Sequence, residues 1–274
     1  MDDVRWQAIP DDRRPEAEER LLSHLGKTRA FLFAIGEVVD NPHGAAILTR
    51  WSAEGHRIAN HTYSHQLSSG GKMTPEEFEA DILRNEGVLQ GYSGFRKWFR
   101  FPALKEGRTR EVRDRFRSFL AQHHYHNGSV TLDTSDWYYD QRLRARIEAQ
   151  PGFEVSRYRQ PYLAHIWDRA QFYDQLSRDV LGRSVPHTIL VHYNLLNSIF
   201  LGDVLSMFRS RGWGVIDAEE AFSDEVFTRM PDTAPAGESL IWALAKETGR
   251  FENRLRYPDE DDVYEKPLLD RLGL

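Results

Sequence analysis

The 274-residue sequence contains no cysteine. This absence excludes disulfides, thiolate zinc sites and cysteine nucleophiles, so any bound metal must be held by histidine and carboxylate side chains. The sequence also lacks an excess of basic residues, because its net charge is -6 and its pI is near 6.0. Without a basic stripe for phosphates, we expect no nucleic-acid partner.

Long hydrophobic runs are missing as well. No stretch approaches the roughly 18 apolar residues that a membrane span needs. The first thirty residues are rich in Asp, Glu and Arg, which is not typical of a signal peptide. The sequence as given therefore predicts no membrane span and contains no export signal, and it leaves localisation and oligomeric state open.

Short apolar runs alternate with longer helical patterns along the first two thirds of the chain. The helical pattern of 15–25 leads into the apolar run 29–35, and the pattern of 42–54 leads into 56–60. Later strands are predicted near 97–101, 129–132, 188–191 and 213–216, and later helices near 108–122, 141–149, 168–181 and 200–211. This alternation predicts an α/β fold with a parallel sheet closed or nearly closed into a barrel.

The last fifty residues have a different composition, with Pro231 and Pro235 near their start. Prolines interrupt regular structure and commonly mark loops. We expect one barrel domain over residues 1–222, with residues 223–274 as a C-terminal extension packed on it.

His61 and His65 are the first candidate metal ligands. A spacing of four places two imidazoles on the same side of a helical turn, which suits two ligands of one ion. The pair follows the predicted strand 56–60, and the chemistry of a barrel lies where its strands end. This position favours a metal site over a structural role.

Asp2 and Asp3 supply adjacent carboxylates at the start of the chain. A hydrolytic metal site needs such groups, one to bind the ion and one to accept a proton. An acidic pair at a terminus is also commonly solvated charge, so these residues by themselves leave both interpretations open.

Three further polar sequences follow apolar runs: Arg100-Phe101-Pro102, Asp133-Thr134-Ser135-Asp136-Trp137 and Leu190-Val191-His192. Each taken alone is compatible with a surface, loop or core role. Their shared position at strand ends favours a common site.

Taken in order over residues 1–222, these sequences resemble the motifs of the polysaccharide deacetylases, the NodB-like group of carbohydrate esterase family 4. The family's H-[ST]-x-x-H motif resembles His61 to His65, and its T-F-D-D-G-P motif resembles Met1 to Arg5 in the Asp pair alone. Its R-x-P, D-x-x-D-W and L-x-H motifs resemble Arg100 to Ala103, Asp133 to Trp137 and Leu190 to His192. The resemblance implies a distorted (β/α) barrel of the NodB-like type.

The resemblance also implies a role for each matched residue. Asp3, His61 and His65 would bind a divalent metal ion, commonly zinc. Asp2 would be the general base, paired with Arg100, and His192 the general acid, oriented by Asp136. The backbone N–H of Ala103 would stabilise the oxyanion, and Trp137 and Leu190 would form the slot for the acetyl methyl group.

These roles imply a metal-dependent hydrolase that removes acetyl groups from an N-acetylated polysaccharide or oligosaccharide. Two alternatives stay open. The same site could cleave an O-acetyl ester or a small N-acyl compound, because the motifs specify the bond and not its carrier. The chain could also be an inactive barrel that binds a glycan, since its first motif is incomplete.

The chain departs from the family pattern at Val4 and Arg5, which replace Gly and Pro, at Ala103, which replaces an aromatic residue, and at Tyr193, where Asp is frequent. Glycine adopts backbone angles that valine resists, so we expect the turn after Asp3 to change.

In the family a strand precedes the Asp pair, whereas here only Met1 precedes Asp2. Chain termini fray unless they are tied down, and such sites need their groups held to within about 0.5 Å. We therefore expect the first strand to be missing or truncated, with an upstream segment that could include an export signal.

Overall fold

The computed structural model describes residues 1–68, 73–256 and 261–274. The strands are β1 Asp2–Asp3, β2 Phe31–Ala34, β3 Arg57–Asn60, β4 Phe95–Phe99, β5 Lys105–Gly107, β6 His126–Asn127 and β7 Ala236–Gly237. The α-helices are α1 Arg14–Leu25, α2 Gly36–Val39, α3 Pro42–Ala53, α4 Pro75–Leu89, α5 Arg110–Gln122, α6 Asp136–Ala149, α7 Arg159–Leu181, α8 Leu195–Ser210, α9 Ala218–Ala221, α10 Leu240–Glu247 and α11 Asp261–Arg271. Short 3-10 helices lie at η1 Trp6–Ala8, η2 Pro102–Leu104, η3 Val155–Tyr158, η4 Glu225–Thr228 and η5 Glu252–Arg254.

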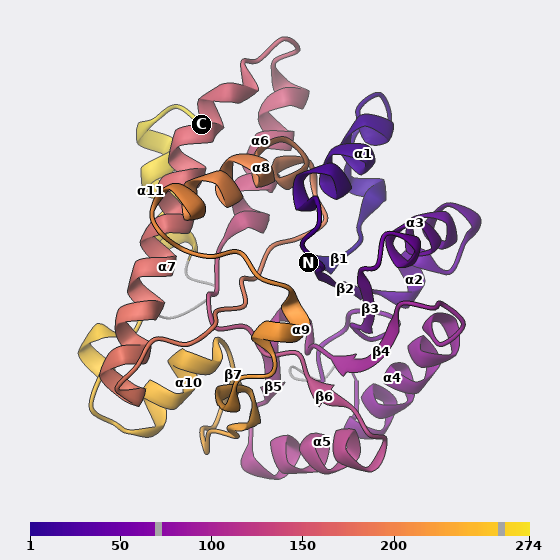
Figure 1. The fold of residues 1–274 in the computed structure, drawn as a ribbon, viewed down its shortest axis with the longest axis vertical. Coiled ribbons are helices and arrows are strands. Elements are labelled where there is room, and N and C mark those ends of the chain that lie inside the picture. The colour runs from indigo at the N-terminus through magenta and orange to yellow at the C-terminus, as the bar shows by residue number, and fades with distance from the viewer. Residues whose placement is uncertain (69–72, 257–260) are drawn as a thin grey trace.

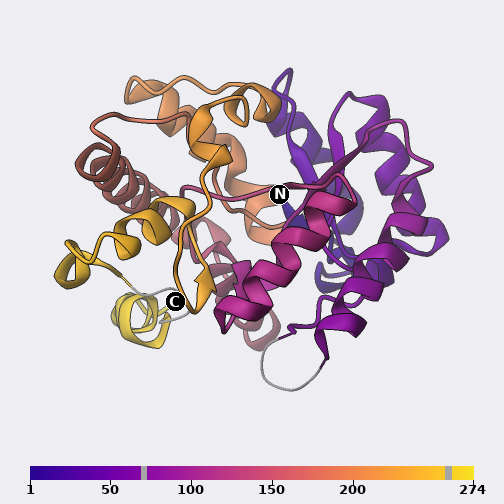
Figure 2. The same ribbon diagram turned by 90° about the horizontal axis from the view of Figure 1, so that it is seen from below.

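A five-stranded parallel sheet forms the centre of the molecule, in the order β1-β2-β3-β4-β6. The N-terminus lies among these strands, and helices surround them in both views (Figures 1 and 2). Parallel strands need such crossover helices, which also cover the faces of the sheet. The predicted α/β class is confirmed.

Two isolated parallel bridges extend the sheet past β1. Asp2 pairs with His192, and Ile189 on the same segment pairs with Leu132. Segment 188–192 therefore occupies the place of a strand between β1 and the segment that follows β6. The distorted barrel consists of a five-stranded ladder and these two bridges, and the ladder itself stays open.

Several helices begin where the sequence places a capping residue. Thr74 forms a capping box with Glu77 at the start of α4, and Asn41 caps α3 through the amide of Gly44. Such caps satisfy backbone N–H groups that have no partner within the helix. The start predicted near residue 42 agrees with the cap at Asn41.

Other element boundaries differ from the prediction. Helices α6, α7 and α8 begin at Asp136, Arg159 and Leu195, earlier than the predicted positions 141, 168 and 200. The first turn of α6 buries Asp136, Tyr139 and Asp140, and buried polar residues hide the apolar periodicity on which the prediction depends. Segment 213–216, predicted as a strand, is irregular.

The C-terminal residues contact the barrel at several points. Strand β7 pairs with β5, and α10 packs against α7. Between β7 and α10, Leu240 N donates to Val130 O at 2.7 Å and Ser239 Oγ donates to Thr131 O at 2.9 Å. The division at residue 222 stays a prediction.

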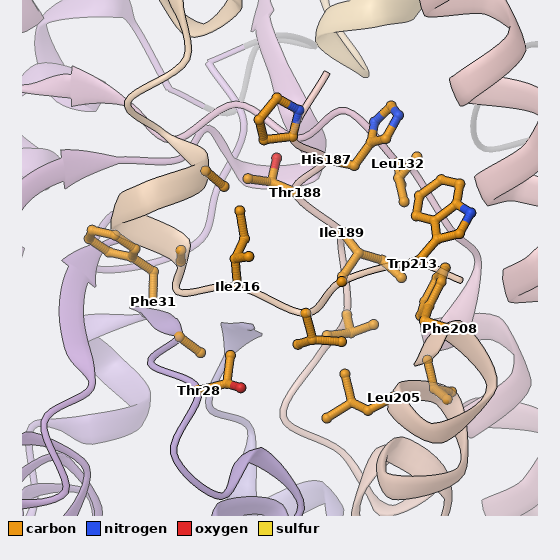
Figure 3. A pocket seen from close by; sticks show the side chains of 18 of the residues that line it. Thr28, Phe31, Leu132, His187, Thr188, Ile189, Leu205, Phe208, Trp213 and Ile216 are labelled. Atoms are coloured by element: carbon orange, nitrogen blue, oxygen red, sulfur yellow. The ribbon is translucent and has the colours of Figure 1, made fainter. Parts of the chain in front are cut away.

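A cavity of about 470 Å³ lies at the starts of the strands, opposite the edge where they end. Figure 3 shows the side chains of Ile189, Leu205 and Ile216 gathered around it. Segment 213–216 lines one wall and the start of β2 lines another. The cavity thus separates the predicted strand 213–216 from the first residues of β2.

None of the helices within residues 1–68, 73–256 and 261–274 is long and apolar enough to cross a membrane.

Candidate active site

The predicted site residues gather at the edge where the parallel strands end. Asp2 and Asp3 form β1, His61 follows β3, Arg100 follows β4, and His192 ends segment 188–192. Polar side chains meet at this edge because all these segments run in the same direction.

Asp3, His61 and His65 converge on one point. Asp3 Oδ1 lies 3.3 Å from Nε2 of each histidine, and the candidate ligand atoms all lie within 4.8 Å of one another. His61 Nδ1 lies 2.8 Å from Arg100 O, so it donates to this carbonyl, and in the neutral imidazole Nε2 is the nitrogen that can bind a metal.

The environment of Asp3 fits a cation. Its Oδ1 is buried and has no hydrogen-bond partner, and a buried carboxylate oxygen without a partner is costly. Burial alone would raise the pKa of Asp3, but the imidazoles of His61, His65 and His192 hold it well below its usual value. Burial lowers the pKa of His65 to about 4, so this imidazole is neutral at pH 7 and able to bind metal.

The histidine pair does not lie on a helical turn, so that part of the prediction is wrong. Both residues belong to an irregular loop after β3, in which Thr62 has φ 62° and His65 has φ 56°. These left-handed residues bring the two rings to a centroid separation of 4.9 Å. The spacing therefore brings the imidazoles together through loop geometry.

Asp2 and Arg100 form a buried ion pair. Arg100 is held in place by a 2.7 Å bond from its Nε to Gly128 O and by stacking over Phe33, 3.9 Å from the ring centroid. Burial would raise the pKa of Asp2, but Arg100 and the nearby N-terminal ammonium keep it below its usual value. Asp2 is therefore an ionised carboxylate that can accept a proton.

Backbone bonds hold the first residues from two sides. Met1 N donates to Phe31 O at 2.7 Å, Phe33 N donates to Met1 O at 2.9 Å, and Asp2 N donates to Val191 O at 3.0 Å. The strand that carries the Asp pair has only two residues, and the truncation of the first strand stays a prediction.

The turn after Asp3 is made without glycine. Asp3 has φ 76° and Val4 has φ 58°, and an L-residue in this region costs about 1–2 kcal/mol. Arg5 Nε donates to Asp3 Oδ2 at 3.0 Å. Val4, in the place of the family's glycine, therefore strains the turn, while Oδ1 of Asp3 still lies 3.3 Å from the two histidines.

His192 and Asp136 form the second charged pair of the site. His192 Nδ1 lies 2.8 Å from Asp136 Oδ1, and Asp136 Oδ2 accepts bonds from His192 N, Asn194 Nδ2 and Asn197 Nδ2. Burial alone would lower the pKa of His192, but Asp136, with Asp3 and Asp2, raises it to about 10. His192 is therefore a protonated imidazole at neutral pH.

A cleft of about 580 Å³ connects these groups. Apart from Arg100 and Asp136, which lie behind Asp2 and His192, every predicted site residue lines it: Asp2, Asp3, His61, His65, Ala103, Trp137, Leu190 and His192. Trp137 is 39 % exposed, whereas Leu190 is buried. The cleft thus combines an ionised carboxylate, a protonated imidazole and a candidate metal site with apolar walls.

Several supporting residues were not predicted. Asn194 and Asn197 orient Asp136, and Asp81 and Asn85 of α4 support the histidine loop. Asn194 also caps α8, and an Asn before an apolar run is a helix-start signal. Asp81 and Asn85 carry no such signal, because their partners lie far away in sequence.

Comparison with known proteins supports the resemblance. The sequence profile described as polysaccharide deacetylase matches residues 10–127. The chain is 27% identical over 124 residues to a peptidoglycan-N-acetylglucosamine deacetylase of Bacillus cereus, a match that covers 45% of this chain and 41% of the relative. The chain therefore spans about two fifths of the length of that curated relative.

Two solved structures share the fold. A polysaccharide deacetylase from Bacillus cereus has a TM-score of 0.54 at 18% identity, covering 79% of this chain and 88% of the other. The peptidoglycan deacetylase PdaC from Bacillus subtilis has a TM-score of 0.50 at 20% identity, covering 81% and 88%. The profile match therefore shows that residues 10–127 are similar to the polysaccharide deacetylases, and the two structures show that the chain shares their fold.

Proposed function

We propose that this chain is a metal-dependent deacetylase that removes acetyl groups from an N-acetylated glycan. The observation that carries the proposal is the buried, partnerless Oδ1 of Asp3, which lies 3.3 Å from Nε2 of both His61 and His65. The similarity to a peptidoglycan-N-acetylglucosamine deacetylase supports a glycan with N-acetylglucosamine units as the substrate class.

Asp3, His61 and His65 would hold the metal ion. Two imidazoles and one carboxylate, with no thiolate, are a donor set suited to zinc at a hydrolytic site. Bound there, the ion would polarise the acetyl carbonyl and lower the pKa of the attacking water.

Asp2 and His192 would carry the proton transfers. Asp2, kept ionised by Arg100, accepts a proton from the water while the oxygen of that water attacks the acetyl carbon. His192, kept protonated by Asp136, donates a proton to the amide nitrogen as the carbon–nitrogen bond breaks. The products are acetate and a free amine on the sugar.

The remaining cleft residues would position the acetyl group. The backbone N–H of Ala103 would donate to the oxyanion that develops on the carbonyl oxygen. Trp137 and Leu190 would enclose the methyl group, since both line the cleft and present apolar surface.

The test is acetate release from N-acetylglucosamine oligomers, measured together with bound metal by elemental analysis. We expect release that is lost on chelation, restored by zinc and abolished in His61→Ala, while His124→Ala, which replaces an exposed histidine outside the cleft, retains activity. A protein that binds no divalent ion, or that releases acetate equally well after chelation, would overturn the proposal.

The same assay on an O-acetylated glycan and on small N-acyl compounds tests the substrate class. Release from the oligomers at the higher kcat/KM supports the proposed glycan amide. A higher kcat/KM for the ester or for the small N-acyl compounds would make that compound the substrate class in place of the glycan amide.

A further inference from the structure

The loop that holds the two histidines cannot maintain its shape by itself. Thr62 and His65 both have left-handed backbone angles, with φ 62° and 56°. Residues other than glycine reach this region only at a cost, and they remain there when surrounding structure imposes it. The source of that support is helix α4 together with the start of α2.

Asp81 of α4 bonds to the loop midway between the histidines. Its Oδ2 accepts from Tyr63 N at 3.0 Å, Ser64 N at 2.9 Å and Ser64 Oγ at 3.0 Å. Asp81 is only 7 % exposed. Three bonds from Tyr63 and Ser64 therefore end on one carboxylate oxygen of α4.

A second set of bonds holds the beginning of the loop. Asn60 Oδ1 accepts from Thr62 N at 2.9 Å and from Asn85 Nδ2 of α4 at 2.9 Å. Asn85 Nδ2 also donates to Ala34 O of β2 at 2.9 Å. The loop is thereby tied to α4 and to the sheet at the residue next to His61.

Helix α2 contacts the loop from the other side. Gly36 N donates to Thr62 O at 3.1 Å, and Glu37 N donates to Tyr63 O at 2.8 Å. A Cβ atom at Gly36 would lie 2.4 Å from the ring of Tyr63, so only glycine permits this approach. The loop is thus clamped between backbone donors of α2 and the carboxylate of Asp81.

We propose that Asp81 is a positioning residue for the metal site, an inference that rests on the proposed function of His61 and His65 as ligands of a divalent ion. It touches neither the cleft nor the ligand atoms. By fixing Tyr63 and Ser64, it sets the separation of the two imidazoles. Outer residues of this kind change metal affinity about 10- to 100-fold when removed.

Cobalt(II) is the probe for the test, because its visible absorption reports the geometry of its ligands as well as occupancy. Titration of the full chain compares wild type, Asp81→Asn and the control Glu79→Gln. Glu79 is another α4 carboxylate, but it bonds to Arg115 at 2.7 and 2.8 Å and not to the loop.

Asp81→Asn is expected to weaken cobalt binding about 10- to 100-fold and to alter the absorption spectrum, while Glu79→Gln changes neither. In acetate release with saturating metal, kcat should fall in Asp81→Asn with little change in KM. Asp81→Glu, which keeps the charge, should recover part of the lost affinity.

Wild-type affinity and spectrum in folded Asp81→Asn would overturn the inference and leave the proposed function intact. Failure of the wild-type chain to bind cobalt would overturn the proposed function itself. If Asp81→Asn does not fold, Ser64→Ala takes its place in the titration, because it removes one of the three donors to Asp81. Unchanged cobalt affinity and absorption spectrum in Ser64→Ala would again overturn the inference.

Discussion

Nδ1 of His192 lies 2.8 Å from Oδ1 of the fully buried Asp136. The two residues are 56 positions apart in the chain, and helix α6 and segment 188–192 bring them together. Asp136 has a further function at the other oxygen, which accepts bonds from the backbone of His192 and from two asparagines. This carboxylate therefore controls both the orientation and the charge of the imidazole.

His192→Ala is expected to lower kcat by about 10²- to 10⁴-fold, the usual contribution of a general acid. The metal content should stay at the wild-type level, because His192 is not one of the three proposed ligands. Elemental analysis and steady-state acetate release on the same preparations provide the measurement. A variant with wild-type kcat would contradict the role of His192 as the acid.

Asp136→Asn is expected to shift the alkaline limb of the pH profile to lower pH. A general acid works while it is protonated, so activity is lost as pH rises through its pKa. Asp136 is the main group that raises the pKa of His192 to about 10, and its removal lowers that pKa. Measurement of kcat from pH 6 to 11 tests the direction, and an unmoved or rising limb would argue against the pairing.

Arg100→Met is expected to destabilise the fold by about 3 kcal/mol or more, because it leaves a buried carboxylate without its main partner. Asp2 would retain the weaker attraction of the N-terminal nitrogen, 3.8 Å away, and of His61 and His192. Chemical denaturation measures the free energy of unfolding. In Asp2→Asn/Arg100→Met the loss should be smaller than the sum of the two single losses, and strict additivity would contradict a direct ion pair.

The same Arg100→Met change is expected to move the acidic limb of activity to higher pH. Arg100 holds the pKa of Asp2 down, and the base works only when ionised, so a higher pKa delays the rise of activity with pH. Lys at this position should shift the limb less than Met, since it keeps the charge. An acidic limb that stays in place would show that Asp2 does not act as the base.

Stability is expected to fall as pH drops below about 6.5, the ordinary pKa of histidine, because burial lowers the pKa of His56 in the folded chain. Its Nδ1 accepts a 3.1 Å bond from Ala30 N, which protonation would break. Below that pH the unfolded chain binds a proton that the folded chain rejects, so stability is present above the window and lost below it. One such histidine adds a slope of up to about 1.4 kcal/mol per pH unit.

His56→Asn should flatten this slope, because its amide oxygen can replace Nδ1 as the acceptor without titrating. The control His124→Asn replaces an exposed histidine and should leave the slope unchanged. Denaturation curves between pH 4.5 and 8 give the slopes. Equal slopes in wild type and His56→Asn would exclude His56 as a source of acid sensitivity.

We propose that residues 223–274 belong to the same folding unit as the barrel, although they form a distinct extension. Leu240, Ile241 and Ala245 of α10 are buried, and Ser239 and Leu240 at the start of this helix bond to Thr131 and Val130. A chain ending at residue 222 is expected to lose cooperative thermal unfolding and to bind a hydrophobic dye. A truncated chain that unfolds cooperatively at the wild-type temperature would instead make the extension dispensable.

Much of the fold was predictable because it depends on local patterns. The helix-strand alternation, the capping box at Thr74 and the apolar run of β2 all depend on neighbouring residues. The structure of segments 188–192 and 213–216 was harder to predict, because strand pairing depends on which segment lies beside each of them in space. One forms single bridges and the other faces a cavity.

The histidine pair shows the same division at the scale of the site. Its spacing and its position after β3 identified it, yet the predicted helical turn is a loop with two left-handed residues. Asp81 and Asn85 impose that shape from α4. A spacing of four is compatible with several backbone paths, and contacts made 17 or more positions away select one of them.

The sequence by itself determined the chemical inventory: three aspartates, three histidines and an arginine at or after predicted strand ends, with no thiol among them. The order of these residues after successive predicted strands was enough to group them, because parallel strands bring their carboxyl ends to one edge of the sheet. Only the tertiary structure decided the state of each group. Burial and facing charges set whether Asp2 is ionised and His192 protonated, and both depend on partners distant in sequence.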